Sequence, residues 1–167
     1  YYQARTNVYD SIGNVTGQKD TAIANRNKSI QVGSGFWQYD LMQKFLYQQS
    51  AKLSHKLNFQ YSTSTDIPRY DRLTDPLNAT TGDSLRFAEW YYGPQDRMLV
   101  AYDMLYAGKT AAFDNMHVIL SYQDIQESRH QRRWNKTNLQ HRIEDVSVMG
   151  ANIDFEKKIN ANTITYG

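Results

Sequence analysis

The stretch Asn115–Trp134 restricts the fold of this chain more than any other segment. In its first half, apolar residues such as Met116 and Val118 alternate with mostly polar ones, which is the two-residue period of a β-strand. The second half keeps that spacing, but both faces become polar or charged. No Gly or Pro interrupts the stretch, so at about 3.3 Å per residue it predicts a strand of about 65 Å. We interpret it as a strand that crosses an apolar layer and then projects into water.

The same alternation predicts further strands, joined by polar connections. The predicted strands are Tyr2–Tyr9, the clearer part of Ile30–Lys52, Leu57–Thr65, Leu85–Tyr106 with a bend at Gly93-Pro94, His141–Lys157 and a last strand after Asn162. Short connections are expected at residues 53–56, 107–114 and 158–162, a further turn at Asn135–Gln140, and longer loops through Gly13, Gly17 and Asn25–Asn27 and at 66–84.

The direction of these strands is as informative as their number. The strand at 115–134 runs from apolar to charged, and the strand at 141–157 runs from charged to apolar. All charged ends therefore fall on one side, and the short connections fall on the other. This asymmetry is typical of an outer-membrane barrel.

We expect an all-β antiparallel meander that forms part of a transmembrane β-barrel, with residues 1–167 as an interior segment of one barrel domain. The residues expected to face the membrane are Leu57, Phe59, Tyr61, Met98, Val100, Tyr102, Met116, Val118, Leu120, Tyr122, Ile153 and Phe155. Tyr106 and Trp90 are expected to join their aromatic girdle.

Composition narrows the function classes. The net charge of +2 is too balanced to indicate a nucleic-acid partner, and the absence of cysteine excludes disulfides and thiolate metal sites. The chain begins without Met and opens on Tyr1-Tyr2, so we expect an interior piece of a longer protein. Two alternatives remain open: a passive porin-like barrel, and a soluble β-sandwich that binds carbohydrate through its many tyrosines.

Four stretches of the sequence resemble stretches of a known protein family. They are Ile30–Tyr39 (IQVGSGFWQY), Asp66–Leu73 (DIPRYDRL), Glu89–Gln95 (EWYYGPQ) and Glu127–Arg133 (ESRHQRR). In this order they resemble TonB-dependent outer-membrane receptors of the haem, cobalamin and siderophore type, including Bacteroidetes members, from about residue 30 to the end.

The resemblance implies energised uptake of a scarce ligand across the outer membrane of a Gram-negative bacterium. It also implies a barrel of about 22 strands with a plug, of which this chain would supply about six. The implied partners are outer-membrane lipid and lipopolysaccharide, the rest of the barrel and plug, TonB through an N-terminal part, and a small ligand at the extracellular face. The plug and the N-terminal segment that contacts TonB have no counterpart in these residues.

Two groups of residues are candidates for binding that ligand. The loop residues Arg69, Tyr70 and Arg72 are of types common at binding surfaces, although they also fit simple loop packing. The cationic group Arg129, Arg132, Arg133 and Arg142 suits a carboxylate or phosphate, although it also fits a solvated strand end. Arg129 and Arg133 share a face, and Arg132 points the other way, so one face would serve the lumen and the other the lipid headgroups.

The histidines His130 and His141 are the third candidate. They belong to strands joined by the predicted turn, and neutral imidazole is a ligand for haem iron. The midpoint between them lies before the centre of that turn, so direct pairing stays open beside a solvated pair. No catalytic residue is predicted, because the adjacent Glu144 and Asp145 would point to opposite sides of a strand. No resident metal or cofactor is predicted either.

Overall fold

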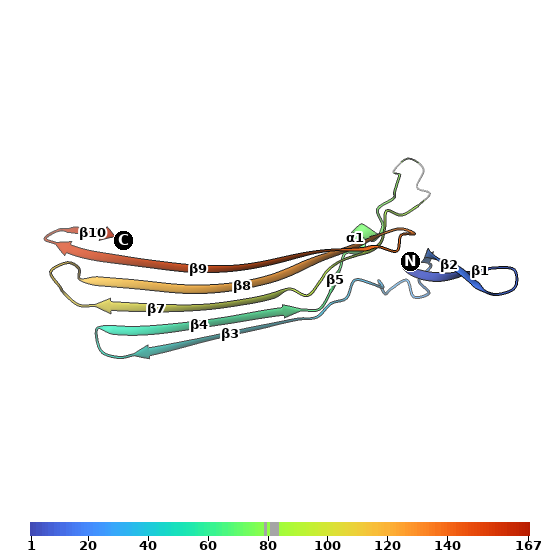
Figure 1. The fold of residues 1–167 in the computed structure, drawn as a ribbon. Coiled ribbons are helices and arrows are strands. Elements are labelled where there is room, and N and C mark those ends of the chain that lie inside the picture. The colour runs from blue at the N-terminus through green and yellow to red at the C-terminus, as the bar shows by residue number, and fades with distance from the viewer. Residues whose placement is uncertain (79, 81–83) are drawn as a thin grey trace. The chain divides into compact units, whose positions relative to one another are not determined.

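The computed structural model describes residues 1–78, 80 and 84–167 (Figure 1). Its regular structure is antiparallel β-sheet with one short helix, so the predicted all-β class is confirmed. No sheet is closed into a barrel within the described ranges. The elements are β1 Tyr2–Tyr9, β2 Val15–Ile23, β3 Gln38–Gln48, β4 Leu53–Ser64, β5 Ile67–Pro68, α1 Tyr70–Leu73, β6 Phe87–Tyr92, β7 Asp96–Ala107, β8 Asn115–Arg133, β9 Leu139–Ile159 and β10 Asn162–Tyr166. The described residues hold no helix that is long and apolar enough to span a membrane.

The chain forms two compact units, each assembled from three separate stretches. Unit 1 comprises Tyr1–Gln38, Ser64–Gln95 and Glu127–Glu144, and unit 2 comprises Tyr39–Thr63, Asp96–Gln126 and Asp145–Gly167. The charged parts of β8 and β9 fall in unit 1, and their apolar parts fall in unit 2. The change of pattern seen in the sequence of these strands therefore coincides with the boundary between the units.

Unit 2 is a sheet in which β4, β7 and β8 are hydrogen-bonded neighbours, with β3 beside β4 and β9 and β10 following β8. Its register brings Leu57 opposite Tyr102, and Tyr102 in turn opposite Leu120. Opposed residues of antiparallel strands share a face. Ser147 of β9 hydrogen-bonds to Asp124 of β8 at 3.0 Å, which adds the odd-numbered residues of β9 to the same face. All the residues expected to face the membrane lie on this face, which we call the apolar face. Whether lipid covers them stays a prediction.

The other side of the same sheet, the polar face, is organised by hydrogen bonds and charge. Asp103 lies between Lys56, at 3.6 Å, and Nε2 of His117, at 3.1 Å. Ser62 donates to Asp40 at 2.6 Å near one margin of the unit. This face is not free of apolar side chains, since Leu105, Val146 and Val148 also lie on it and are exposed. The two faces of unit 2 differ in that only the polar face carries the charge contacts around Asp103.

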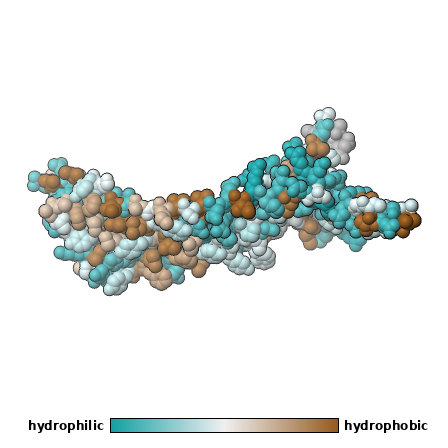
Figure 2. All heavy atoms as spheres, in the orientation of Figure 1, coloured by the Kyte–Doolittle hydropathy of each residue, from teal (hydrophilic) through white to brown (hydrophobic). Residues whose placement is uncertain are grey.

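Within unit 2, Phe113 packs against Tyr106 and Phe155 at one end of the apolar face, but residues farther along the strands stay exposed. Leu120 is 46% exposed and Met149 is 83% exposed. The buried hydrophobic residues of the described ranges are Ala88 and Trp90, and both belong to unit 1. In the view of Figure 2, hydrophobic side chains crowd the surface of unit 2, whereas most of the surface of unit 1 is hydrophilic. A sheet built this way lacks the interior that a soluble sandwich would have.

Unit 1 contains the hairpin of β1 and β2 together with β5, α1, β6 and the ends of β8 and β9. Strand β6 pairs with the charged end of β8, so that Tyr91 lies opposite His130 and Tyr92 opposite Arg129. Short β5 pairs with the other side of β6. These pairings place the aromatic residues of β6 beside the cationic residues of β8.

Several predicted boundaries are wrong for local reasons. The expected loop after Tyr9 is instead a hairpin, because the Asp10 carboxylate accepts the amides of Ile12 and Asn14 and closes a tight turn. The residues 53–56 begin β4 rather than connecting two strands. The actual turn is at 49–52, where the amide of Gln49 donates to the carbonyl of Leu53 at 3.0 Å.

The other differences concern strand length. The predicted strand in Ile30–Lys52 is regular only from Gln38 to Gln48, and Leu85–Tyr106 is two strands separated by residues 93–95. The loop at 66–84 contains β5, α1 and a bridge between Pro76 and Leu85. Within that predicted loop, Ala79 and residues 81–83 lie outside the described residues.

Candidate functional site

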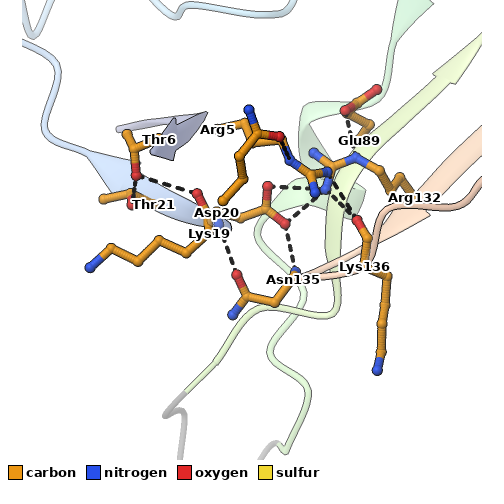
Figure 3. A network of polar contacts seen from close by, with 10 residues as sticks. Arg5, Thr6, Lys19, Asp20, Thr21, Glu89, Arg132, Asn135 and Lys136 are labelled. Carbon is orange, nitrogen blue, oxygen red and sulfur yellow. Dashed lines mark hydrogen bonds and ion pairs between the residues drawn. The ribbon is translucent and has the colours of Figure 1, made fainter. Parts of the chain in front are cut away.

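The most buried charges of the described residues form a polar network in unit 1 (Figure 3). Arg132 of β8 is 5% exposed. Its Nη1 donates to both carboxylate oxygens of Asp20, at 3.0 and 2.8 Å, and its Nε donates to Glu89 at 2.7 Å. The same Nη1 donates to the carbonyl of Lys136 at 2.8 Å. The network therefore connects β2, β6 and the β8–β9 turn.

The turn is shaped around this network. Asn135 has a positive φ of 56°, a conformation that Asn tolerates better than most residues. Its backbone amide donates to the Asp20 carboxylate, and its side-chain oxygen accepts the Asp20 amide at 2.7 Å. Burial acts to lower the pKa of Arg132, but the hydrogen bonds from its guanidinium to Asp20 and Glu89 outweigh burial and raise that pKa. Arg132 thus stays charged as an internal clasp.

A second cluster surrounds the ring of Tyr92. The guanidinium carbon of Arg69 lies 5.6 Å from the ring centroid, and that of Arg129 lies 5.5 Å from it. Arg69 also lies 5.4 Å from the ring of Trp90 and donates to the Tyr92 hydroxyl at 3.0 Å. One aromatic ring therefore contacts two cations, which is a favourable arrangement for each of them.

The two arginines around Tyr92 differ in the hydrogen-bond and ion-pair partners of their guanidinium groups. Arg69 makes two parallel hydrogen bonds to Asp71, at 2.8 and 2.7 Å. The hydrogen bond to Arg69 is the main reason that the pKa of Asp71 lies below its ordinary value. Arg129 has no such carboxylate among the described residues, and its Nε is buried without a hydrogen-bond partner. Arg129 is the unsatisfied cation of this cluster.

A further cation adjoins Arg129 across the β8–β9 hairpin. His130 contacts His141, and Gln131 donates to Gln140 at 2.8 Å. The same register places Arg142 opposite Arg129. Two like charges at opposed positions repel each other, and neither has an ion pair among the described residues. An anion that bridged them would remove both the repulsion and the unpaired Nε.

The two predicted histidines meet directly. Nδ1 of His130 lies 2.6 Å from Nδ1 of His141, and Nε2 of His130 lies 2.8 Å from the hydroxyl of Ser128. The ring of Tyr91 stacks on that of His130 at 4.7 Å and 14°. This pair lies on the Arg132 side of β8, opposite to Arg129.

The remaining predicted site residues are not gathered with these. The Tyr70 hydroxyl donates to the carbonyl of Tyr1 at 3.4 Å, and exposed Arg72 pairs with Asp75 at 3.5 Å. Arg133 is exposed at the end of β8, opposite Phe87. Within the predicted cationic group, Arg132 is not available to contact a ligand, because its guanidinium already donates hydrogen bonds to Asp20 and Glu89.

The sequence did not predict the residues that contact these candidates in the folded chain. Asp20 lay in an expected loop, and Tyr91 and Tyr92 were read only as parts of a strand. Trp90 was expected in a lipid-facing girdle, but it is 8% exposed within unit 1, beneath Arg69. The run of three consecutive aromatic residues before Gly93 was the available signal, because adjacent Tyr91 and Tyr92 must point to opposite faces.

No protein-family model, no curated protein and no solved structure matches this chain. The functional argument therefore rests on the residues and on their arrangement.

Proposed function

We propose that this chain is a wall segment of a TonB-dependent outer-membrane receptor, with the apolar face of unit 2 against lipid. The receptor would carry out energised uptake of a scarce ligand such as haem, cobalamin or an iron–siderophore into a Gram-negative bacterium. The choice of this receptor family among barrel proteins rests on the four stretches of sequence that resemble it. The observation that carries the proposal is the uncovered apolar face of unit 2, backed by an ordered polar face.

Lipid is the occupant that fits this apolar face best. In water, a continuous exposed apolar surface is an aggregation hazard unless a partner covers it. In a membrane barrel, the same surface faces the hydrocarbon, and the polar side chains of alternate residues face the lumen. The backbone groups of such a wall are satisfied between strands, as they are for the strands that lie between the two edges β3 and β10.

A lipid-facing wall is tested by labelling the two faces separately. The chain has no cysteine, so single cysteines at Leu120 and Gln123 can each carry a fluorescent bimane group. In outer-membrane vesicles, brominated lipid should quench the Leu120→Cys label and aqueous iodide should not. The Gln123→Cys label should show the reverse. Equal quenching of both labels by iodide would refute the lipid-facing wall, whereas a Leu120→Cys label that neither quencher reaches would favour a soluble sandwich.

Within this receptor, the unsatisfied Arg129 marks the contact for an acidic group on the ligand. Arg129 and Arg142 lie opposite each other, and both lack a carboxylate among the described residues. A carboxylate or phosphate would accept hydrogen bonds from both guanidinium groups. Uptake of haem, cobalamin and a ferric siderophore should be measured with Arg129→Gln and Arg142→Gln. Both variants should slow uptake of the same probe, and Arg86→Gln is the exposed control.

Energy dependence separates this receptor from the porin-like alternative. A TonB-dependent receptor loses uptake when a protonophore collapses the proton gradient of the inner membrane. A passive porin continues to equilibrate its solute. Uptake that persists after the gradient is removed would retain the lipid-facing wall but would eliminate energised transport.

A further inference from the structure

The contact between His130 and His141 has an unusual requirement. The two Nδ1 atoms are 2.6 Å apart, and each imidazole nitrogen that lacks a proton presents a lone pair. Two lone pairs would repel at this distance, so something positive must lie between the nitrogens. The candidates are one proton or one metal ion.

We propose that His130 and His141 form a binding site for a divalent transition-metal ion, with water completing the coordination shell. Imidazole nitrogen is a preferred ligand for Cu²⁺, Ni²⁺ and Zn²⁺. Metal–nitrogen bonds of about 2.0–2.1 Å place two ligands on one ion about 3 Å apart. To reach that separation, the exposed ring of His141 would shift by a fraction of an ångström and turn, so that the lone pairs of both nitrogens converge on one ion. The site lies within unit 1 and does not depend on the transport proposal.

The Ser128 hydroxyl and the ring of Tyr91 supply the contacts that can hold His130 in the form that a metal requires. When Nε2 donates its proton to the Ser128 hydroxyl, Nδ1 keeps its lone pair free for a metal. A hydrogen bond at the second nitrogen is the usual way in which proteins orient a ligating histidine. The stacked ring of Tyr91 fixes the plane of the imidazole. Gly93 leaves room for this arrangement, because a Cβ there would lie 2.7 Å from Nε2 of His130.

The charges on the same side of β8 do not oppose a cation. The nearest positive group on the same side of β8 is Arg132, whose charge is balanced by Asp20 and Glu89. A cation at the histidine pair therefore meets no unbalanced positive charge from that neighbour.

The geometry suits a bare ion better than a haem. Two axial ligands of one haem iron lie on opposite sides of the ring, about 4 Å apart. Here both nitrogens approach from adjacent strands of one hairpin. No group of three or more His, Cys, Asp or Glu residues is positioned to hold a metal among the described residues. The pair therefore predicts a two-imidazole site that is open to water and exchangeable.

Binding is tested on the full chain, folded in detergent, by calorimetric titration with Cu²⁺ and Ni²⁺. We expect one ion per chain, and at least about a tenfold loss of affinity in His141→Gln, which removes one of two ligands. The double variant His55→Gln/His117→Gln removes the other histidines and should bind as tightly as the unaltered chain. The electron paramagnetic resonance spectrum of bound Cu²⁺ should show two nitrogen ligands, and only one in His141→Gln.

Ser128→Ala tests the orienting role separately. It leaves both imidazoles in place but frees the ring of His130, so affinity should fall by about tenfold. His141 is exposed, and an unchanged circular dichroism spectrum would show that its substitution leaves the fold intact. The proposal is overturned if the unaltered chain binds no Cu²⁺, or if His141→Gln binds it as tightly as the unaltered chain. In either case, a shared proton alone links the two rings.

Discussion

The two units of this chain maintain their structures by opposite means. In unit 1, the least exposed charged side chains are Arg132 and Asp20, which bind each other directly. In unit 2, large apolar residues such as Leu120 and Met149 remain exposed on one face of a single sheet. Strand β8 contributes to both units. One strand thus supplies Arg132 to a buried ion pair in unit 1 and Leu120 to an exposed apolar face in unit 2.

This difference indicates which surroundings each unit requires. An ion pair shielded from water depends on hydrogen bonds made within the chain, because these offset the cost of removing both charges from water. An uncovered apolar face gains its stabilisation only from whatever medium covers it. Substitutions in unit 1 should therefore act in any medium, whereas those on the apolar face of unit 2 should act through lipid.

The largest effect is expected at the clasp of unit 1. Asp20→Ala leaves the guanidinium of Arg132 buried with only Glu89 as a carboxylate partner. Removing one partner of a buried pair typically costs about 3–5 kcal/mol. Denaturant unfolding should show a loss near the lower limit, because Glu89 remains. Arg133→Ala, at an exposed neighbouring position, should change stability by less than about 0.5 kcal/mol. Equal effects of the two variants would mean that the clasp is not a stabilising feature.

The next effect tests whether lipid stabilises unit 2. Leu120→Arg places a charge on the apolar face and should cost about 2–4 kcal/mol if that position lies near the bilayer midplane. Gln123→Arg, on the opposite face of the same strand, should be tolerated. Folding into lipid vesicles measures both variants. A similar loss for both, or none for Leu120→Arg, would contradict the different roles of the two faces.

The sequence predicted unit 2 better than unit 1 for a physical reason. Alternation along a strand records which face each residue occupies, and β4, β7 and β8 alternate cleanly enough to define the apolar face. The clasp joins Asp20 to Arg132 across more than a hundred positions, and neither residue lies in a repeating pattern. Such a pair is specified by tertiary packing, which local periodicity does not record.

The candidate site shows the same limit. The midpoint argument left contact between His130 and His141 open because it assumed a centred turn at 135–140. The turn is tighter, since β9 begins at Leu139 and Asn135 adopts a positive φ. Arg69 and Arg129 were separate candidates, and only Tyr92, an unremarked strand residue, brings them together. The residue types were predictable, but their partners were not.

A smaller effect is expected at Gly93, where β6 ends beside the histidines. A Cβ at this position would lie 2.1 Å from the Ser128 hydroxyl and 2.7 Å from Nε2 of His130. The serine can rotate away, but the stacked histidine has less freedom, so Gly93→Ala should cost about 1–2 kcal/mol. Gly35→Ala meets nothing within 4 Å and is the control. Adding Ser128→Ala to Gly93→Ala should recover part of the loss in denaturant unfolding.

The smallest effect depends on pH and concerns the connection between β7 and β8 in unit 2. Asp114 accepts the backbone amide of Lys158 at 2.9 Å and the ammonium of Lys157 at 3.0 Å. The amide of Lys158, followed by the side chain of Lys157, lowers the pKa of Asp114 below its ordinary value of 3.8. The charged form of Asp114 is therefore favoured more strongly in the folded chain than in the unfolded chain.

The sign of this contribution distinguishes it from lipid stabilisation. A carboxylate whose pKa falls on folding adds stability above its unfolded pKa, and this stability is lost as the pH falls through the folded value. Asp114→Asn should therefore weaken the protein at neutral pH and approach the unaltered chain in acid. Asp145→Asn, at an exposed position, is the control and should leave the stability at neutral pH nearly unchanged. If the effect of Asp114→Asn is the same at every pH, hydrogen-bond geometry rather than charge stabilises this connection. The effect of Leu120→Arg should persist in acid, because arginine stays charged there.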